Sequence, residues 1–346
     1  MGVVTRSESV LPGDVVEVRP PAEILATLDE NGSLDAMPFM PEMLAHVGKR
    51  FTVSRRVEKI CNNVDFTSSA GRRMQSVVHL DDLRCNGSGH DGCQLACRLY
   101  WKEEWLRKVD DPQAPPPEPA PGALQEPALR ELVEAGTRTV RQVDGEPVET
   151  YRCQGTEALA ATGPLHKFDP RQFTRELAAR NVKAPHMMSA IARSFWFKGL
   201  RMLRLRRLLV LDLPDDAKSP SFEPVGLKAG DLVRVKSREE VAATLNREAR
   251  NRGLSFSPEM VPFCGGTYRV RDRVERLIDE KTGKMIELSR DCLILEGAVC
   301  RGVDGCWAFM FCPRGTFPFW REAWLERVEE AGNGASAPAQ LTETPA

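Results

Sequence analysis

The chain lacks the segments that would place it in or across a membrane. Its 346 residues contain no run of about 18 apolar residues, the length that a spanning helix needs. Residues 1–18 also lack a basic stretch followed by an apolar core, so we see no secretory signal peptide. With both signals missing, the cytoplasm is the expected compartment.

The chain has no excess of either charge. Its 48 Lys and Arg residues are matched by 49 Asp and Glu residues, and the formal net charge is −1. A near-neutral chain gains little from the electrostatic attraction that draws proteins onto nucleic acid. Nucleic acid is therefore not the expected partner.

Familiar catalytic motifs are missing as well. The sequence contains no G-x-S-x-G, H-E-x-x-H, P-loop or G-x-G-x-x-G pattern. Asn86–His90, NGSGH, resembles a phosphate-binding loop only superficially, because it contains no lysine. The sequence therefore names no reaction and leaves open whether the protein is an enzyme.

What the chain does have is cysteine, with 10 residues of this type. In a cytoplasmic protein, thiols are more often metal ligands, reactive groups or small buried residues than disulfides. The thiols concentrate in Leu80–Val109 and Leu295–Val328, and each of these stretches closes on a pair of tryptophans. A clustered set of thiols is the main chemical feature of this sequence.

The two stretches belong to an internal duplication. Residues 12–18, PGDVVEV, match residues 229–235, AGDLVRV, and Pro-Glu-Met recurs at 41–43 and 258–260 in the same register. Further along, the cysteines align as three pairs, which are Cys85 with Cys300, Cys93 with Cys306, and Cys97 with Cys312. We therefore expect two related modules.

Each module is predicted to be mostly β, with one early helix. In the first copy the helix starts at Pro20-Pro21 and ends at Gly32, and in the second a Ser237–Glu240 capping box starts a helix that runs to Gly253. The expected strands are 15–18, 51–53 and 77–80 in the first copy, and 232–235, 268–270 and 292–295 in the second.

Two resemblances suggest what these modules are. The opening Gly13-Asp14 with the later Gly48-Lys49 resembles small SH3-like barrels of the KOW type, which implies an interaction module and another protein as partner. The whole chain also resembles a group of uncharacterised bacterial cysteine-rich proteins, which supplies no function. That likeness rests on Arg84-Cys85, Gly92-Cys93-Gln94, Trp101-Lys-Glu103, Trp105-Leu106 and Arg152-Cys153-Gln154.

The predicted fold class is mainly β with helices (α+β), in which two homologous SH3-like barrels flank a helical middle region. The middle region should contain a helix at 128–135 and a hairpin at 139–151. The expected parts are 1–109 (first barrel), 110–127 (proline-rich linker), 128–226 (middle region), 227–329 (second barrel) and 330–346 (disordered tail).

The cysteines predict one metal or cluster site in each module. The expected ligands are Cys61, Cys85, Cys93 and Cys97 in the first copy, and Cys292, Cys300, Cys306 and Cys312 in the second. An iron–sulfur cluster accepts the irregular spacing, whereas zinc usually uses C-x2-C pairs, which are absent. Unliganded core cysteines, disulfides and thiol redox chemistry are the alternatives.

Several other residues keep more than one interpretation. His79 and His90 are spare ligands or structural histidines, and the role of Cys264 stays open. Cys153 is a structural residue, a ligand that completes the first site, or a nucleophile whose pKa Arg152 lowers. The basic stretch 193–209 is a packed amphipathic helix or a helix that lies on a membrane surface or nucleic acid.

These features support three hypotheses for function. The first is an accessory or interaction protein that binds a metal or an iron–sulfur cluster through tandem small barrels. The second is a redox or Lewis-acid metalloenzyme with a cysteine-ligated centre. The third is a nucleic-acid or ribosome-associated protein, against which the neutral charge speaks.

Overall fold

The computed structural model describes residues 9–62, 71–111, 125–143, 145–166, 168–202, 219–302 and 310–329. The described residues form a mixed α+β fold of mostly antiparallel strands, which confirms the predicted class. The chain divides into two compact units. Unit 1 contains Met1–Val182 and Arg276–Ile286, and unit 2 contains Lys183–Glu275 and Glu287–Ala346.

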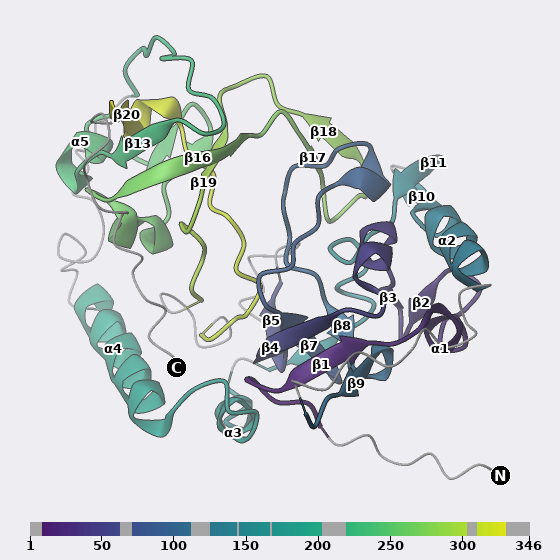
Figure 1. Ribbon diagram of the computed structural model, residues 1–346. Coiled ribbons are helices and arrows are strands. Elements are labelled where there is room, and N and C mark those ends of the chain that lie inside the picture. The colour runs from purple at the N-terminus through teal and green to yellow at the C-terminus, as the bar shows by residue number, and fades with distance from the viewer. Residues whose placement is uncertain are drawn as a thin grey trace. The chain divides into compact units, whose positions relative to one another are not determined.

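Unit 1 is built on a five-stranded sheet with the order β8-β7-β4-β1-β9 (Figure 1). Its strands are β1 (Val15–Val18), β4 (Arg50–Arg56), β7 (Val77–Leu80), β8 (Trp101–Lys102) and β9 (Leu106–Lys108). A 3₁₀ turn, η3 (Glu103–Trp105), joins the last two strands. The expected strands of the first copy are therefore confirmed.

The tryptophan pair of unit 1 lies at the centre of its core. Trp101 and Trp105 are fully buried, and Phe39 meets both rings edge-on, with its centroid 6.2 and 5.1 Å from theirs. The Trp105 indole N–H donates to the Thr27 hydroxyl at 3.1 Å. Buried aromatic rings contribute roughly 3–5 kcal/mol each, so this cluster is a principal source of stability.

Shorter elements surround this sheet in unit 1. They are α1 (Pro21–Leu25), β2 (Ser33–Leu34), β3 (Met37–Pro38), η1 (Pro41–His46), β5 (Lys59–Cys61), β6 (Gly71–Arg73), η2 (Ser88–His90), α2 (Glu126–Ala135), β10 (Arg138–Val143), β11 (Glu146–Tyr151), β12 (Gly163–Leu165), α3 (Arg171–Ala178), β17 (Arg276–Ile278) and β18 (Met285–Glu287). The expected middle helix and hairpin correspond to α2 and the β10–β11 pair.

Unit 2 contains a four-stranded sheet with the order β19-β16-β13-β20. Its elements are α4 (Ala184–Met202), β13 (Leu232–Val235), α5 (Arg238–Ala242), β14 (Arg250–Asn251), β15 (Leu254–Ser255), η6 (Pro258–Phe263), β16 (Thr267–Arg273), β19 (Leu293–Leu295), η7 (Glu322–Trp324) and β20 (Leu325–Arg327). The expected strands of the second copy are therefore present too.

The two sheets repeat each other down to single contacts. Both have a register shift in the same place, at Val53/Arg55 and at Val270/Asp272. The Trp324 indole donates to a threonine hydroxyl at 3.0 Å, just as Trp105 does. Among the described strands neither sheet closes on itself, so the SH3-like barrels stay a prediction.

The early helices are shorter than expected. Side chains just beyond them accept hydrogen bonds from backbone N–H groups that a longer helix would use. The Asp29 carboxylate accepts the N–H groups of Asn31 and Ser33, both at 2.9 Å, beyond α1. The Asn246 side chain does the same for Glu248 and Arg250 beyond α5, at 3.1 and 2.9 Å. Such local bonds favour turns over helix, so α1 and α5 end early.

The compact units also differ from the expected parts. The middle region is divided at Val182, and Arg276–Ile286 leaves the second repeat to join unit 1. Cys306, residues 112–124 of the linker, residues 203–209 of the basic stretch and the tail from residue 330 lie outside the described residues.

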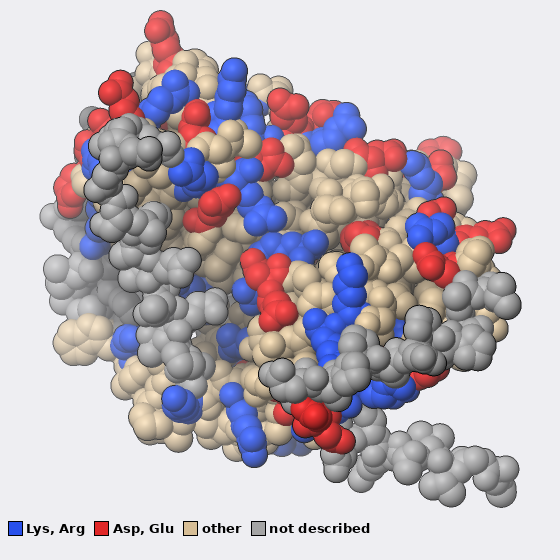
Figure 2. Space-filling view, in the orientation of Figure 1, with Lys and Arg blue, Asp and Glu red and all other residues tan. Residues whose placement is uncertain are grey.

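Surface features bear on the membrane and nucleic-acid hypotheses. No described helix is both long and apolar enough to cross a bilayer. On α4, the Met188 and Trp196 side chains are 65% and 67% exposed. On the face drawn in Figure 2, Lys and Arg side chains stand among Asp and Glu side chains.

We predict that His79, on β7, makes unit 1 sensitive to acid. Burial lowers the pKa of His79 to about 3, and its Nδ1 bonds the Leu99 carbonyl at 2.9 Å. The unfolded chain takes up a proton below about pH 6.5 and the folded chain does not, so stability should fall by about 1.4 kcal/mol per pH unit from pH 6 towards pH 3.

Urea unfolding at several pH values tests this prediction. His79→Asn keeps a donor and removes the titrating group, so it should flatten the acid slope. The same change at the exposed His166 serves as the control and should leave the slope as it is. An unaltered slope in His79→Asn would refute the assignment.

Candidate metal centre

A short backbone pairing after β7 places Cys85 opposite Cys97. Arg84 and Arg98 form an antiparallel bridge, the Cys85 N–H donates to the Cys97 carbonyl at 2.8 Å, and the Leu99 N–H donates to the Leu83 carbonyl at 3.0 Å. Opposite residues on such a ladder lie about 4.5–5.5 Å apart at Cα and point to the same face. The two thiols are therefore neighbours.

The loop between these segments folds back on itself at Gly87. The Gly87 carbonyl accepts the N–H groups of His90 and Gly92, at 2.9 and 3.0 Å, and the Gly87 N–H faces the Cys85 Sγ at 3.3 Å. A Cβ on Gly87 would lie 2.2 Å from the Cys93 carbonyl oxygen, and its φ is +76°. Glycine thus allows Cys93 to return beside Cys85.

Cys153 comes from a distant segment that is clamped on both sides. The Gln154 amide donates to the carbonyls of Pro38 and Tyr100, at 3.0 and 2.8 Å, and its oxygen accepts the Tyr100 N–H at 2.8 Å. The Arg152 guanidinium donates to the Asn31 carbonyl at 2.7 Å. These bonds fix the position of the Cys153 backbone.

The clamp argues against Cys153 as a nucleophile. Burial raises the pKa of Cys153 to about 11, the opposite of the lowering expected from Arg152. The Arg152 guanidinium instead bonds backbone and hydroxyl oxygens, including the Ser33 hydroxyl at 2.6 Å. A neutral buried thiol is a poor nucleophile, so the raised pKa favours the structural and ligand interpretations of Cys153 over the nucleophile interpretation.

The segment Arg276–Ile286 adds to this part of unit 1. The Ile278 N–H faces the Cys93 Sγ at 3.4 Å. Gln94 and Arg276 exchange bonds, both at 3.1 Å, in which the Gln94 N–H donates to the Arg276 carbonyl and the Arg276 N–H donates to the Gln94 side chain. Cys93 is thereby covered and 8% exposed.

The thiols of Cys85, Cys93, Cys97 and Cys153 line one cavity of about 30 Å³. The other residues that line it are Met40, Glu42, His90, Leu95, Ala96, Arg98, Leu99, Gln154, Gly155, Ile278 and Glu280. This volume accommodates about one water molecule. Three of the predicted ligands of the first copy and Cys153 therefore line the same cavity, but no three of these four sulfur atoms lie within 4.8 Å of one another.

Two polar side chains face this cavity unexpectedly. Glu42 on η1 and His90 on η2 are buried, and their ligand atoms and the Cys85 Sγ all lie within 4.8 Å of one another. Burial and then the Glu42 carboxylate raise the pKa of Cys85, and burial lowers the pKa of His90. Without a cation, the thiol and the imidazole are therefore held neutral.

The other predicted ligands of unit 1 lie elsewhere. Cys61 ends β5, where it pairs with Gly71, and it does not line the cavity. His79 bonds the Leu99 carbonyl from the sheet. Sequence reasoning missed Glu42, although the repeated Pro-Glu-Met motif that contains it was visible.

In the described residues of the second repeat, which exclude 303–309, one of the predicted ligand pairs does not match. There the Cys300 N–H donates to the Thr316 carbonyl at 2.8 Å, which is the bond that Cys85 makes to Cys97 in unit 1. Thr316, rather than Cys312, therefore occupies the position of Cys97, and the expected alignment is wrong at this pair. Cys292 is buried, and burial raises its pKa to about 12.

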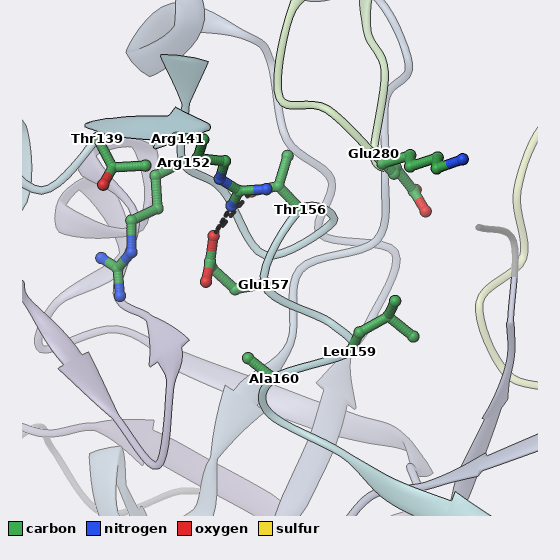
Figure 3. Close-up of a pocket in the computed structure, with 9 residues that line it drawn as sticks. Thr139, Arg141, Arg152, Thr156, Glu157, Leu159, Ala160 and Glu280 are labelled. Atoms are coloured by element: carbon green, nitrogen blue, oxygen red, sulfur yellow. Dashed lines mark hydrogen bonds and ion pairs between the residues drawn. The ribbon is translucent and has the colours of Figure 1, made fainter. Parts of the chain in front are cut away.

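A second, open cavity of about 380 Å³ lies on unit 1 (Figure 3). The Arg141 guanidinium and the Glu157 carboxylate form an ion pair on its wall. Glu280 also borders the thiol-lined cavity. Because the ion pair satisfies both charges, this cavity offers a weaker anchor for a ligand than the thiol-lined one.

Comparisons with known proteins give no further identification. No protein family, curated protein or solved structure matches this chain.

We predict that Gly87→Ala destabilises unit 1 by about 3 kcal/mol or more, because it adds a backbone clash to the cost of a left-handed conformation, which alone is about 1–2 kcal/mol. Gly48→Ala is the matched control, since Gly48 has a φ of +72° and open space around it. Urea midpoints should therefore fall further for Gly87→Ala. Equal losses would contradict the close approach to Cys93.

We also predict that Gln154→Ala loosens the cavity. The change leaves buried backbone groups of Tyr100 and Pro38 without a partner, which costs about 1–3 kcal/mol per group. The Cys153 thiol should then react faster with a thiol reagent, as mapped by mass spectrometry. Gln142→Ala on β10 is the control, and labelling of Cys153 at the unaltered rate in Gln154→Ala would contradict the clamp.

Proposed function

We propose that unit 1 is a metal-binding module whose centre is ligated by thiolates of the cysteine-lined cavity, within an accessory or interaction protein. One observation carries the proposal. Thiols from separate segments, Cys85–Cys97 and Cys153, converge on a single buried cavity. Thiolate sets of this kind hold zinc or iron–sulfur clusters.

Backbone donors around the sulfur atoms support this proposal. Gly87 directs an N–H at the Cys85 Sγ and Ile278 directs one at the Cys93 Sγ. Gly155 and Thr156 do the same for Cys153 and oppose the rise of its pKa that burial causes. Such donors favour a negatively charged sulfur, and so does a bound cation.

Unliganded core cysteines are the main alternative. Core thiols behave as small hydrophobes and are surrounded by apolar side chains. The cavity here also contains the carboxylates of Glu42 and Glu280 and the imidazole of His90. A buried polar lining is costly in an apolar core and useful around a metal, so it favours the metal-binding module.

The interaction role rests on the order of the strands. In both units the first strand of the repeat pairs with the last, and a 3₁₀ turn precedes that last strand. This arrangement supports the SH3-like resemblance, and folds of that kind mostly bind partners. The small volume of the thiol-lined cavity, about 30 Å³, supports this role over a metalloenzyme.

The proposal predicts that Cys85→Ser and Cys97→Ser lower metal content and thermal stability together, because metal-binding energy is folding energy. Protein purified without oxygen should carry about one metal centre per chain, and each variant should lose most of it. Elemental analysis, acid-labile sulfide and melting curves measure these quantities and separate zinc from iron–sulfur.

Cys264→Ser, a change at a half-buried thiol of unit 2, is the matched control and should keep the metal. If Cys85→Ser and Cys97→Ser both retained the metal and the melting temperature of the parent, the core-cysteine alternative would stand instead.

A further inference from the structure

Two side chains in unit 1 bury polar atoms for which the described part of the chain offers no hydrogen-bond partner by geometry. Glu42 is 8% exposed, and neither of its carboxylate oxygens has a hydrogen-bond partner there. His90 is 1% exposed, and its Nε2 is also without one. Burying a carboxylate unpaired is costly, and proteins normally satisfy such groups with a hydrogen bond, an ion pair or a metal.

These side chains converge from different elements on one thiol. Glu42 lies on η1, His90 ends η2, and Cys85 follows β7. Their ligand atoms all lie within 4.8 Å of one another. Among the described residues, no other set of three or more His, Cys, Asp and Glu side chains meets this distance. A tetrahedral ion with bonds of about 2.0–2.3 Å needs ligand atoms roughly 3.3–3.8 Å apart, so small side-chain movements would suffice.

The donor chemistry selects the kind of metal. Carboxylate, imidazole and thiolate together are typical of a single zinc-class ion, whereas iron–sulfur clusters are held mainly by thiolates. The cavity volume of about 30 Å³ is that of about one water and also favours one ion over a cluster. The ligand types and the cavity volume therefore both favour a single zinc-class ion over an iron–sulfur cluster.

We propose that Glu42, Cys85 and His90 bind a single Zn²⁺-class divalent ion, and that Cys97, which lies opposite Cys85 in the backbone pairing but outside the 4.8 Å group, moves toward the ion as a fourth ligand. This inference rests on the proposed metal-binding function and deepens it, since it names the oxygen and nitrogen ligands and the class of metal. Cys93 and Cys153 then cover the ion within the same cavity.

Cobalt substitution of the whole protein tests the ligand set. Metal-free protein titrated with Co²⁺ should bind about one equivalent, with the visible bands of a tetrahedral ion and a thiolate charge-transfer band. Glu42→Gln and His90→Asn should each weaken Co²⁺ and Zn²⁺ binding by 10-fold or more and shift the visible bands. Loss of Cys85 should also abolish most of the charge-transfer band.

Matched controls separate ligation from folding. Glu259→Gln changes the glutamate of the second Pro-Glu-Met motif, and His46→Asn changes a half-buried histidine on η1, so both should bind Co²⁺ like the parent. Glu42→Gln should also leave unchanged or raise the melting temperature of the metal-free protein, because it removes an unpaired buried charge. A purely structural carboxylate would lower that temperature.

The outcomes distinguish this inference from the function on which it rests. Binding that depends on both Glu42 and His90 supports both. A bound metal or iron–sulfur cluster that is unaffected in Glu42→Gln and His90→Asn overturns the mixed ligand set and leaves the thiolate module standing. A parent protein that binds neither Co²⁺ nor Zn²⁺ and carries no iron overturns both.

Discussion

The candidate centre of unit 1 depends on one backbone constraint, the pairing of residues 83–85 with residues 97–99. It follows the β7–β8 pairing of the sheet, in which Val78 lies opposite Trp101, after a turn at residues 80–83 that shifts the register. Because the tryptophans anchor that sheet in the core, the position of the Cys85–Cys97 pair is fixed by the most stable part of the unit. The turn at Gly87 then has one compact route, which brings His90 and Cys93 to the same cavity.

Local patterns in the sequence were enough to predict the frame of both units. Gly-Asp turns, β-branched runs and the paired tryptophans predicted β1, β7, β13 and the repeat, because these signals act over a few residues. The helices were too long in the prediction, since Asp29 and Asn246 redirect the backbone through their side chains. In both repeats the capping signals predicted the start of the helix correctly, but the local side-chain hydrogen bonds that end it were not recognised.

The candidate site was predicted only in part, because its members meet through tertiary structure. Cys85, Cys93 and Cys97 lie close in sequence and were found by their spacing. Cys153 joins them through the Gln154 clamp, and no local pattern carries that information. Glu42 lies in a motif that both repeats share, so nothing in the sequence marked it as a ligand. The alignment error at Cys312 arose because extra residues follow Cys300. Only the hydrogen bond from Cys300 to Thr316 shows which residue corresponds to Cys97.

The difference between the repeats bears on why the thiols are present at all. Unit 2 builds the same sheet, with Phe256 edge-on to Trp324 at 5.2 Å and Arg273 paired with Glu322, although threonine stands in the position of Cys97. The sheet therefore does not require that thiol. Among the described residues, the buried oxygens of Glu42 and the buried Nε2 of His90 accept or donate no hydrogen bond by geometry, which costs free energy in the metal-free chain. The replaceable thiol and the unsatisfied polar atoms of Glu42 and His90 therefore both support the proposed metal-binding module.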